Sequence, residues 1–181
     1  VYKRQPLYLY DEKKLTNDDF YIMEFIEGAT IANYDVAENY DEIEKHIISK
    51  SFIETLLEIH NFNVVDSELS NLGQHENYVE RQIKRWNKQF QAQKVRDIED
   101  LDKATALLLE NIPTQQIVRI VHGDYRLDNV RVNKNRVSAV LDWELCTLGD
   151  PLADLGTVIA SWNDQTAVSY THLRAHETKA N

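Results

Sequence analysis

The most constraining feature of this 181-residue sequence is a series of short apolar strands that brackets one polar loop. Residues 117–121 (Ile-Val-Arg-Ile-Val) predict a strand, and residues 122–129 predict the loop. Residues 130–132 and 137–141 predict two further strands, joined by an Asn-Lys-Asn-Arg turn. The segment therefore predicts a polar loop that is flanked by short strands.

The remaining elements predict a hairpin followed by helices. Residues 6–10 and 20–26 favour two antiparallel strands that stop at Gly28, and residues 29–40 favour a polar connection. Apolar residues recur at helical spacing in several later segments, and Pro151 suits a first helical position. The predicted helices cover residues 41–60, 78–94, 97–111 and 151–161. This order of elements predicts an α+β fold.

Two of the predicted helices carry an apolar face that we expect to be buried. The first face consists of Ile43, Ile47, Ile48, Phe52, Leu56 and Ile59. The second consists of Ile83, Trp86 and Phe90 in the helix over residues 78–94. Both sets predict helices that pack against a core.

The polar loop holds the residue types that phosphoryl transfer requires. The sequence His122-Gly123-Asp124-Tyr125-Arg126-Leu127-Asp128-Asn129 follows one strand, and Asp142 ends the last strand. Transfer of a phosphoryl group needs divalent metal, which takes carboxylate and amide oxygens. A hydroxyl acceptor also needs a carboxylate that orients it and takes its proton. Asp124 suits the base, and Asn129 and Asp142 suit the metal ligands.

Local structural roles are the alternatives for these residues. Asp124 and Asn129 are also good turn formers that bond to their own backbone. His122 is read as a structural histidine buried behind the loop, and Asp128 as a solvent-facing residue or local cap. The strand–loop–strand context favours the combined reading of Asp124, Asn129 and Asp142 as a reaction site.

These residues also resemble a family. Residues 122–156, HGDYRLDNVRVNKNRVSAVLDWELCTLGDPLADLG, are similar to the phosphotransferase family that includes aminoglycoside phosphotransferases and choline kinases. The likeness is greatest to the phosphotransferase-like domain related to acyl-CoA dehydrogenase family members. Further similar segments are FYIMEFIEG at 20–28, LEIHNFN at 57–63 and RQIKRWNKQ at 81–89. The resemblance implies a protein-kinase-like fold, represented by most of the helical C-lobe with the last N-lobe hairpin and the hinge.

The resemblance implies an ATP-dependent phosphotransferase that uses Mg²⁺ and acts on a small-molecule hydroxyl. Asp124 then corresponds to the catalytic base, and Asn129 and Asp142 to the metal ligands. Asp154 resembles a family aspartate that braces the loop, and His122 supports the loop with it. The alternative for Asp154 is an ordinary carboxylate on a helix face.

The same resemblance places adenine against a hinge. The backbone of Glu24, Phe25 and Ile26 would bind the base, and Met23 would guard the pocket. The alternative is that Met23 and Phe25 are ordinary core residues of a strand.

The ends of the chain do not continue the pattern of its middle. We expect residues 1–5 and 168–181 to be non-native, because both strings resemble translated sequencing-adapter read-through. Residues 6–28 then form the end of the N-lobe and the hinge, and residues 29–167 a partial C-lobe. The family's phosphate-covering loop and its lysine find no match here, so we expect little or no kinase activity from this chain alone.

The composition limits the classes of molecule that we expect the chain to bind. The net charge of -10 argues against non-specific binding to nucleic acid, and no apolar run approaches membrane-spanning length. A single cysteine, Cys146, excludes an internal disulfide and favours a cytoplasmic location. The expected partner is a small molecule that carries a hydroxyl group, and the oligomeric state stays open.

Two other functions compete with the kinase. One is a pseudokinase or binding module with the same fold, and the other is a metal-dependent hydrolase that uses Asp124 and Asp142 as paired carboxylates. The offset of Asn129 and the hinge-like strand favour the kinase. The acceptor stays open among aminoglycosides, choline, sugars and hydroxylated acyl compounds, and the likeness at Arg81–Trp86 leans toward a metabolic hydroxyl.

Overall fold

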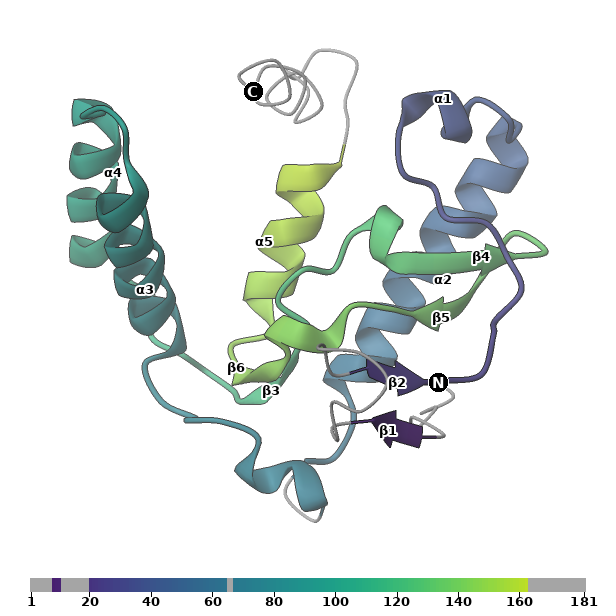
Figure 1. The fold of residues 1–181 in the computed structure, drawn as a ribbon, viewed down its shortest axis with the longest axis horizontal. Coiled ribbons are helices and arrows are strands. Elements are labelled where there is room, and N and C mark those ends of the chain that lie inside the picture. The colour runs from purple at the N-terminus through teal and green to yellow at the C-terminus, as the bar shows by residue number, and fades with distance from the viewer. Residues whose placement is uncertain (1–7, 11–19, 65–66, 163–181) are drawn as a thin grey trace. The chain divides into compact units, whose positions relative to one another are not determined.

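The computed structural model of the chain describes residues 8–10, 20–64 and 67–162 (Figure 1). These residues form two compact units that interleave along the sequence. The first unit contains the described residues up to Glu58 together with Arg126–Asp142, and the second contains those of Ile59–Tyr125 and Trp143–Trp162. The end segments expected to be non-native, 1–5 and 168–181, lie outside the described residues.

The first unit begins with the expected antiparallel hairpin. Strand β1 (Tyr8–Tyr10) pairs with β2 (Phe20–Ile22), with Tyr8 opposite Ile22. Strand β2 ends at Ile22, so the expectation of a strand as far as residue 26 is wrong. The connection after it also contains a short helix, α1 (Tyr34–Ala37), which the polar sequence did not predict.

Helix α2 (Glu42–His60) confirms the prediction for residues 41–60. Its start is fixed by a capping box: Asp41 Oδ1 accepts the Glu44 N–H at 2.8 Å, and Glu44 Oε2 accepts the Asp41 N–H at 3.0 Å. Four residues of its expected apolar face are buried: Ile48, Phe52, Leu56 and Ile59. Ile47 is half-buried, and Ile43, which lies in the first turn, is 72% exposed.

A second hairpin completes the first unit. Strands β4 (Val130–Asn133) and β5 (Arg136–Val140) pair antiparallel, with Val130 opposite Val140 and an irregularity between Arg131 and Val132. Lys134 and Asn135 make the turn with φ of 49° and 60°. Two positive φ angles in a two-residue loop match the twist of the strands, which explains the tight reversal.

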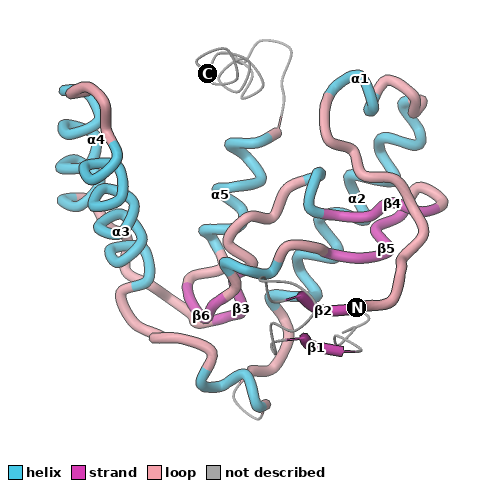
Figure 2. Tube along the Cα trace, viewed as in Figure 1, coloured by secondary structure: helices cyan, strands magenta, loops and turns pink. Residues whose placement is uncertain are grey.

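The second unit combines a helical hairpin with a small sheet (Figure 2). Helices α3 (Tyr78–Gln93) and α4 (Glu99–Glu110) were both predicted, and strand β3 (Arg119–Val121) is shorter than the predicted strand. β3 pairs antiparallel with β6 (Thr147–Gly149), a strand that the sequence did not predict. The remaining elements of the described residues are α5 (Leu152–Ser161) and the single-turn 3-10 helices η1 (Glu68–Asn71) and η3 (Trp143–Leu145) in the second unit, and η2 (Leu127–Asn129) in the first.

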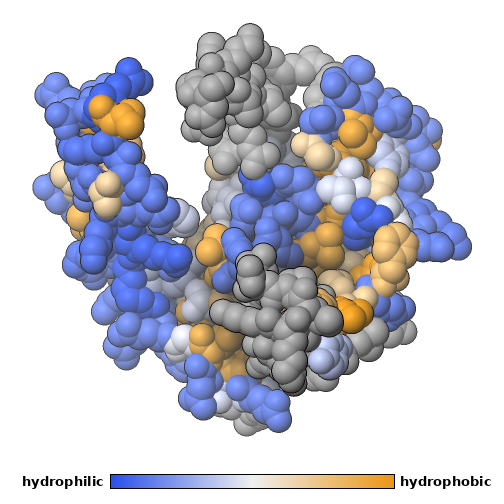
Figure 3. Space-filling view, in the orientation of Figure 1, coloured by the Kyte–Doolittle hydropathy of each residue, from blue (hydrophilic) through white to orange (hydrophobic). Residues whose placement is uncertain are grey.

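The core of the second unit lies around the small sheet. Val121, Tyr125, Leu148 and Val158 are buried there. The α3–α4 hairpin, by contrast, shows mainly hydrophilic side chains on the face drawn in Figure 3, and Trp86 is 49% exposed although we expected it on a buried face. Among the described helices, none has both the length and the apolar character needed to cross a bilayer.

Candidate active site

The polar loop, residues 122–129, begins on a buried carboxylate of the second unit. Asp154 in α5 is 0% exposed, and its two oxygens accept the main-chain N–H groups of His122 and Gly123, each at 2.8 Å. His60 Nε2 lies 3.0 Å from Oδ2 of the same carboxylate. A buried carboxylate is costly unless it is hydrogen-bonded, and these three contacts supply the bonds. Asp154 is therefore not the exposed helix-face carboxylate of the alternative reading.

The side chain of His122 holds the main chain of Asp124, the residue expected to act as the base. Its ring is fully buried, and Nδ1 accepts the Asp124 N–H at 3.3 Å. The ring also packs edge-on against Tyr125, at 5.8 Å between centroids, and tilted against Trp143, at 4.7 Å. This is the buried structural histidine that the sequence suggested, and its contacts limit the freedom of the half-buried Asp124.

Gly123 turns the chain between these two residues. Its φ is +88°, a conformation that L side chains rarely adopt. A Cβ there would also lie 2.8 Å from Leu145 Cβ and 2.9 Å from the Leu145 carbonyl oxygen. Only glycine fits this position without displacement of the neighbouring segment.

The first unit brings Asn129 and Asp142 to one end of the β4–β5 hairpin. The Leu141 N–H donates to the Asn129 carbonyl at 2.8 Å, which extends the ladder one step beyond Val130 and Val140. Asp142 follows directly, is exposed, and has a φ of 60°. A left-handed aspartate turns the chain sharply at the strand end, in a conformation unusual for a residue with a Cβ.

The chemistry of this pair suits Mg²⁺. A carboxylate and an amide carbonyl are hard oxygen donors, and Mg²⁺ is usually bound by one or two carboxylates together with waters and phosphate oxygens. Within the described ranges, no group of three or more His, Cys, Asp or Glu side chains is arranged to hold a metal ion. A site at the hairpin end would therefore depend on Asp142 and Asn129 with oxygens from the nucleotide and water.

The expected hinge segment has no regular secondary structure. Met23, Glu24 and Phe25 are exposed, Phe25 to 81%, and Ile26 is half-buried. The alternative reading of Met23 and Phe25 as core strand residues is therefore wrong, because the strand ends before both. A largely exposed segment without regular secondary structure is compatible with a role in binding a planar base.

The predicted residues are divided between the two units. Asp124, His122 and Asp154 belong to the second unit, whereas Asn129, Asp142 and the segment 23–26 belong to the first. Sequence reasoning missed His60, although the segment 57–63 that contains it was noted. The signal was a histidine in the last turn of a predicted helix, which gives no indication of a partner 94 residues away.

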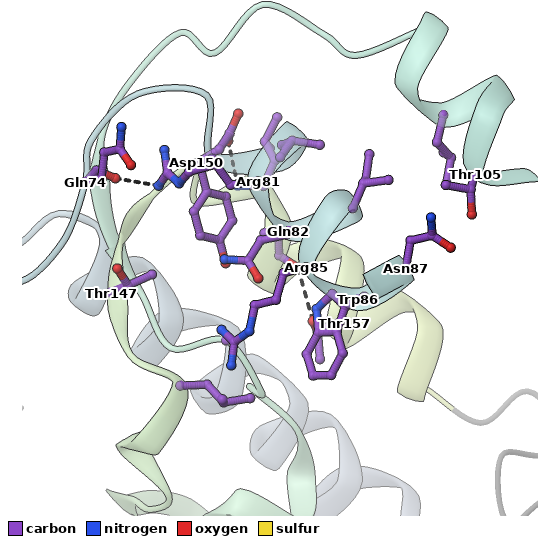
Figure 4. Close-up of a pocket in the computed structure, with 18 of the residues that line it drawn as sticks. Gln74, Arg81, Gln82, Arg85, Trp86, Asn87, Thr105, Thr147, Asp150 and Thr157 are labelled. Atoms are coloured by element: carbon purple, nitrogen blue, oxygen red, sulfur yellow. Dashed lines mark hydrogen bonds between the residues drawn. The ribbon is translucent and has the colours of Figure 1, made fainter. Parts of the chain in front are cut away.

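A groove in the second unit runs alongside the start of the polar loop (Figure 4). Its volume is about 1180 Å³, and its lining includes Gly123, residues 144–147 and the start of α5. Helix α3 contributes Tyr78, Arg81 and Arg85. The groove therefore opens next to the residue that precedes Asp124.

Comparison with known proteins identifies relatives that match most of the chain. The human acyl-CoA dehydrogenase family member 11 is 32% identical over 154 residues, which cover 83% of this chain and 20% of the relative. Family member 10 of the mouse is 32% identical over 149 residues, 81% of this chain and 14% of that protein. The chain thus spans about a fifth or less of the length of these relatives.

Solved structures agree on the fold. A protein of Ralstonia eutropha JMP134 assigned to the aminoglycoside phosphotransferases shares 31% identity with a TM-score of 0.78, over 92% of this chain and 53% of that one. The aminoglycoside phosphotransferase APH(4)-Ia, solved with ADP and hygromycin B, has a TM-score of 0.61 at 19% identity, over 85% of this chain and 53% of that chain. The expected α+β, protein-kinase-like fold is confirmed. The profile of the phosphotransferase enzyme family matches residues 4–179, and the chain belongs to that family.

Proposed function

We propose that the protein of which this sequence is part transfers a phosphoryl group from ATP to a hydroxyl of a small molecule. Membership of the phosphotransferase family supports the reaction class. The observation that carries the proposal is the β4–β5 hairpin, whose ladder brings Asn129 and Asp142 to one end. Neighbouring structures bound to ATP or ADP support the choice of nucleotide.

Asp142 and Asn129 would hold the metal. Both carry oxygen donors, and the bond from the Leu141 N–H to the Asn129 carbonyl joins the main chain of Asn129 to the residue before Asp142. When bound, Mg²⁺ offsets the negative charge of the phosphates. The left-handed turn at Asp142 places its carboxylate after the strand rather than within the ladder.

Asp124 would orient the acceptor hydroxyl and take its proton. A general base must keep a fixed position relative to the hydroxyl, and the loop before Asp124 is held by Asp154 and His122. The main chain of residues 24–26 would bind adenine, with Met23 beside it. A small-molecule alcohol as partner and a cytoplasmic location belong to the same proposal.

Metal and nucleotide binding test the first part. We expect Asp142→Ala and Asn129→Ala to weaken binding of Mn²⁺, a paramagnetic substitute for Mg²⁺, about tenfold or more when ATP is present. The matched control is Asp35→Ala, an exposed carboxylate of the same unit, which we expect to leave the affinity within about twofold. Equal affinities in all four proteins would refute the metal site.

Phosphoryl transfer tests the base. In a longer version of the protein that turns over, Asp124→Asn is expected to lower kcat about 10²–10⁴-fold and to leave ATP binding unchanged. Full activity of that variant would refute the assignment. Tight Mn²⁺–ATP binding with no transfer to any alcohol would favour the binding-module alternative instead.

A further inference from the structure

Two arginines of α3 line the groove beside the polar loop. Arg81 and Arg85 lie one helical turn apart, so their side chains leave the same face of the helix. Figure 4 shows Arg81 reaching Gln74, whose carbonyl accepts a bond from Nη2 at 2.5 Å. The other terminal nitrogen, Nη1, is buried, and nothing in the described part of the chain accepts a hydrogen bond from it.

Neither guanidinium has a carboxylate partner. Among the described residues, no Asp or Glu oxygen comes within 4.0 Å of Arg81 or Arg85. A buried donor without a partner is destabilising, so an acceptor that reached Nη1 would stabilise the arrangement.

Neither of the acidic residues that line the groove, Asp150 and Glu144, forms an ion pair with Arg81 or Arg85. Asp150 is buried, and its Oδ1 accepts the Leu152 N–H at 3.0 Å at the start of α5. Glu144 is exposed in η3. The positive charges of Arg81 and Arg85 do reach the Tyr78 hydroxyl, where they oppose the effect of burial on its pKa.

The neighbourhood of the two arginines is largely apolar and aromatic. The Arg81 guanidinium carbon lies 6.0 Å from the centroid of the Tyr78 ring, and that of Arg85 lies 5.5 Å from the Trp86 ring. Further walls come from Ile83 and Phe90. Arg81 is half-buried and Arg85 is exposed, so the low polarity of these walls strengthens the attraction of Arg81 for a bound anion more than that of Arg85.

We propose that Arg81 and Arg85 bind an oxyanion of the acceptor, either a carboxylate or a phosphate ester. The planar guanidinium offers paired N–H groups that match the two oxygens of such groups. Resting on the proposed function, this makes the acceptor an anionic alcohol and not a polycation. Gly123 lines the same groove and immediately precedes Asp124, so the anion would be held in the groove that borders the proposed base.

The test is to titrate the 181-residue chain with anions in the absence of nucleotide. Binding is measured by amide NMR shifts or by calorimetry. The probes are inorganic phosphate, acetate, neutral glycerol and streptomycin. Phosphate or acetate is expected to bind, and Arg81→Gln and Arg85→Gln are expected to raise its Kd about tenfold. Arg81→Lys, which keeps the charge but loses the paired donors, is expected to give an intermediate loss. The anion that binds more tightly shows whether the oxyanion of the acceptor is a carboxylate or a phosphate ester.

The matched control is Arg96→Gln, an exposed arginine after α3 that does not line the groove. We expect its anion affinity to stay within about twofold of the parent. The proposal is overturned if Arg96→Gln weakens binding as much as the other two variants, if neither anion binds, or if streptomycin binds more tightly than both anions. Because ATP is absent, this result is independent of the Mn²⁺–ATP experiment, and either proposal can fail alone.

Discussion

Nε2 of His60 lies 3.0 Å from Oδ2 of Asp154, the oxygen that also accepts the main-chain N–H of His122. One buried carboxylate therefore joins the last turn of α2, the first turn of α5 and the start of the polar loop within the second unit. The three partners come from segments far apart in sequence. Loss of any one of them leaves a buried acceptor with fewer bonds.

We predict that His60→Ala lowers the free energy of unfolding by about 1–3 kcal/mol, because the buried Asp154 carboxylate loses a hydrogen-bond partner. Urea denaturation followed by circular dichroism measures the effect. The control is His46→Ala, an exposed histidine on the same helix, which should change stability by no more than about 0.5 kcal/mol. Equal effects at both positions would show that the contact with Asp154 is unimportant.

Gly123→Ala is expected to destabilise the protein by about 1–3 kcal/mol, because φ is positive there and the new methyl group would overlap Leu145. Gly156→Ala is the matched comparison. That glycine lies inside α5 with no atom within 4 Å of the position of a Cβ, so alanine should stabilise by about 0.5–1 kcal/mol. The same sign for both substitutions in thermal denaturation would contradict the strained geometry at Gly123.

The β4–β5 turn offers a stabilising substitution. Lys134 has a φ of 49°, which asparagine tolerates better than lysine. Lys134→Asn should therefore raise the free energy of unfolding by about 0.5 kcal/mol. Lys134→Ile, with a branched Cβ, should lower it by about 1 kcal/mol or more. The prediction fails if chemical denaturation ranks the two variants in the opposite order.

Tyr78 makes stability depend on alkaline pH. Burial, reinforced by the charge of Asp154, raises the pKa of its hydroxyl from 10.0 to about 12. The unfolded chain loses the proton first, so this contribution is complete below pH 10 and is lost as the pH rises toward 12. Tyr78→Phe should flatten the fall of unfolding free energy across that window. Parallel curves for the parent and the variant, measured by denaturant titration at each pH, would exclude this origin.

The long helices and the β4–β5 hairpin followed from patterns that the chain carries locally. Helix α2 has both a capping box at Asp41 and apolar residues at helical spacing, so two independent signals agreed. The exposure of Ile43 could not be read from that spacing, because the first turn of a helix follows the same period whether or not a neighbour covers it. Strand β6 was missed for a related reason: Thr147-Leu148-Gly149 is too short for a pattern, and its pairing with β3 is not local.

The candidate site was predictable as a set of residue types but not as an arrangement. The offsets among Asp124, Asn129 and Asp142 identified the loop and the strand end. The bonds from Asp154 and His60 were not visible, because a carboxylate on a helix carries no sequence mark of the main-chain groups that will bury it. The missing acid partners of Arg81 and Arg85 likewise depend on where the other charges fall in space.

The interleaving of the two units has a consequence for any attempt to dissect the gene. Within the described residues, the sequence changes unit after Glu58, after Tyr125 and again after Asp142, so two of these three crossings lie in or at the end of the segment formed by the polar loop and its returning hairpin. Within these residues, no contiguous segment contains the whole of one unit and nothing of the other. Recombination that exchanges one contiguous block would carry Asp124 away from Asn129 or would transfer pieces of both units. A segment that keeps Asp124 together with Asn129 and Asp142 therefore contains parts of both units.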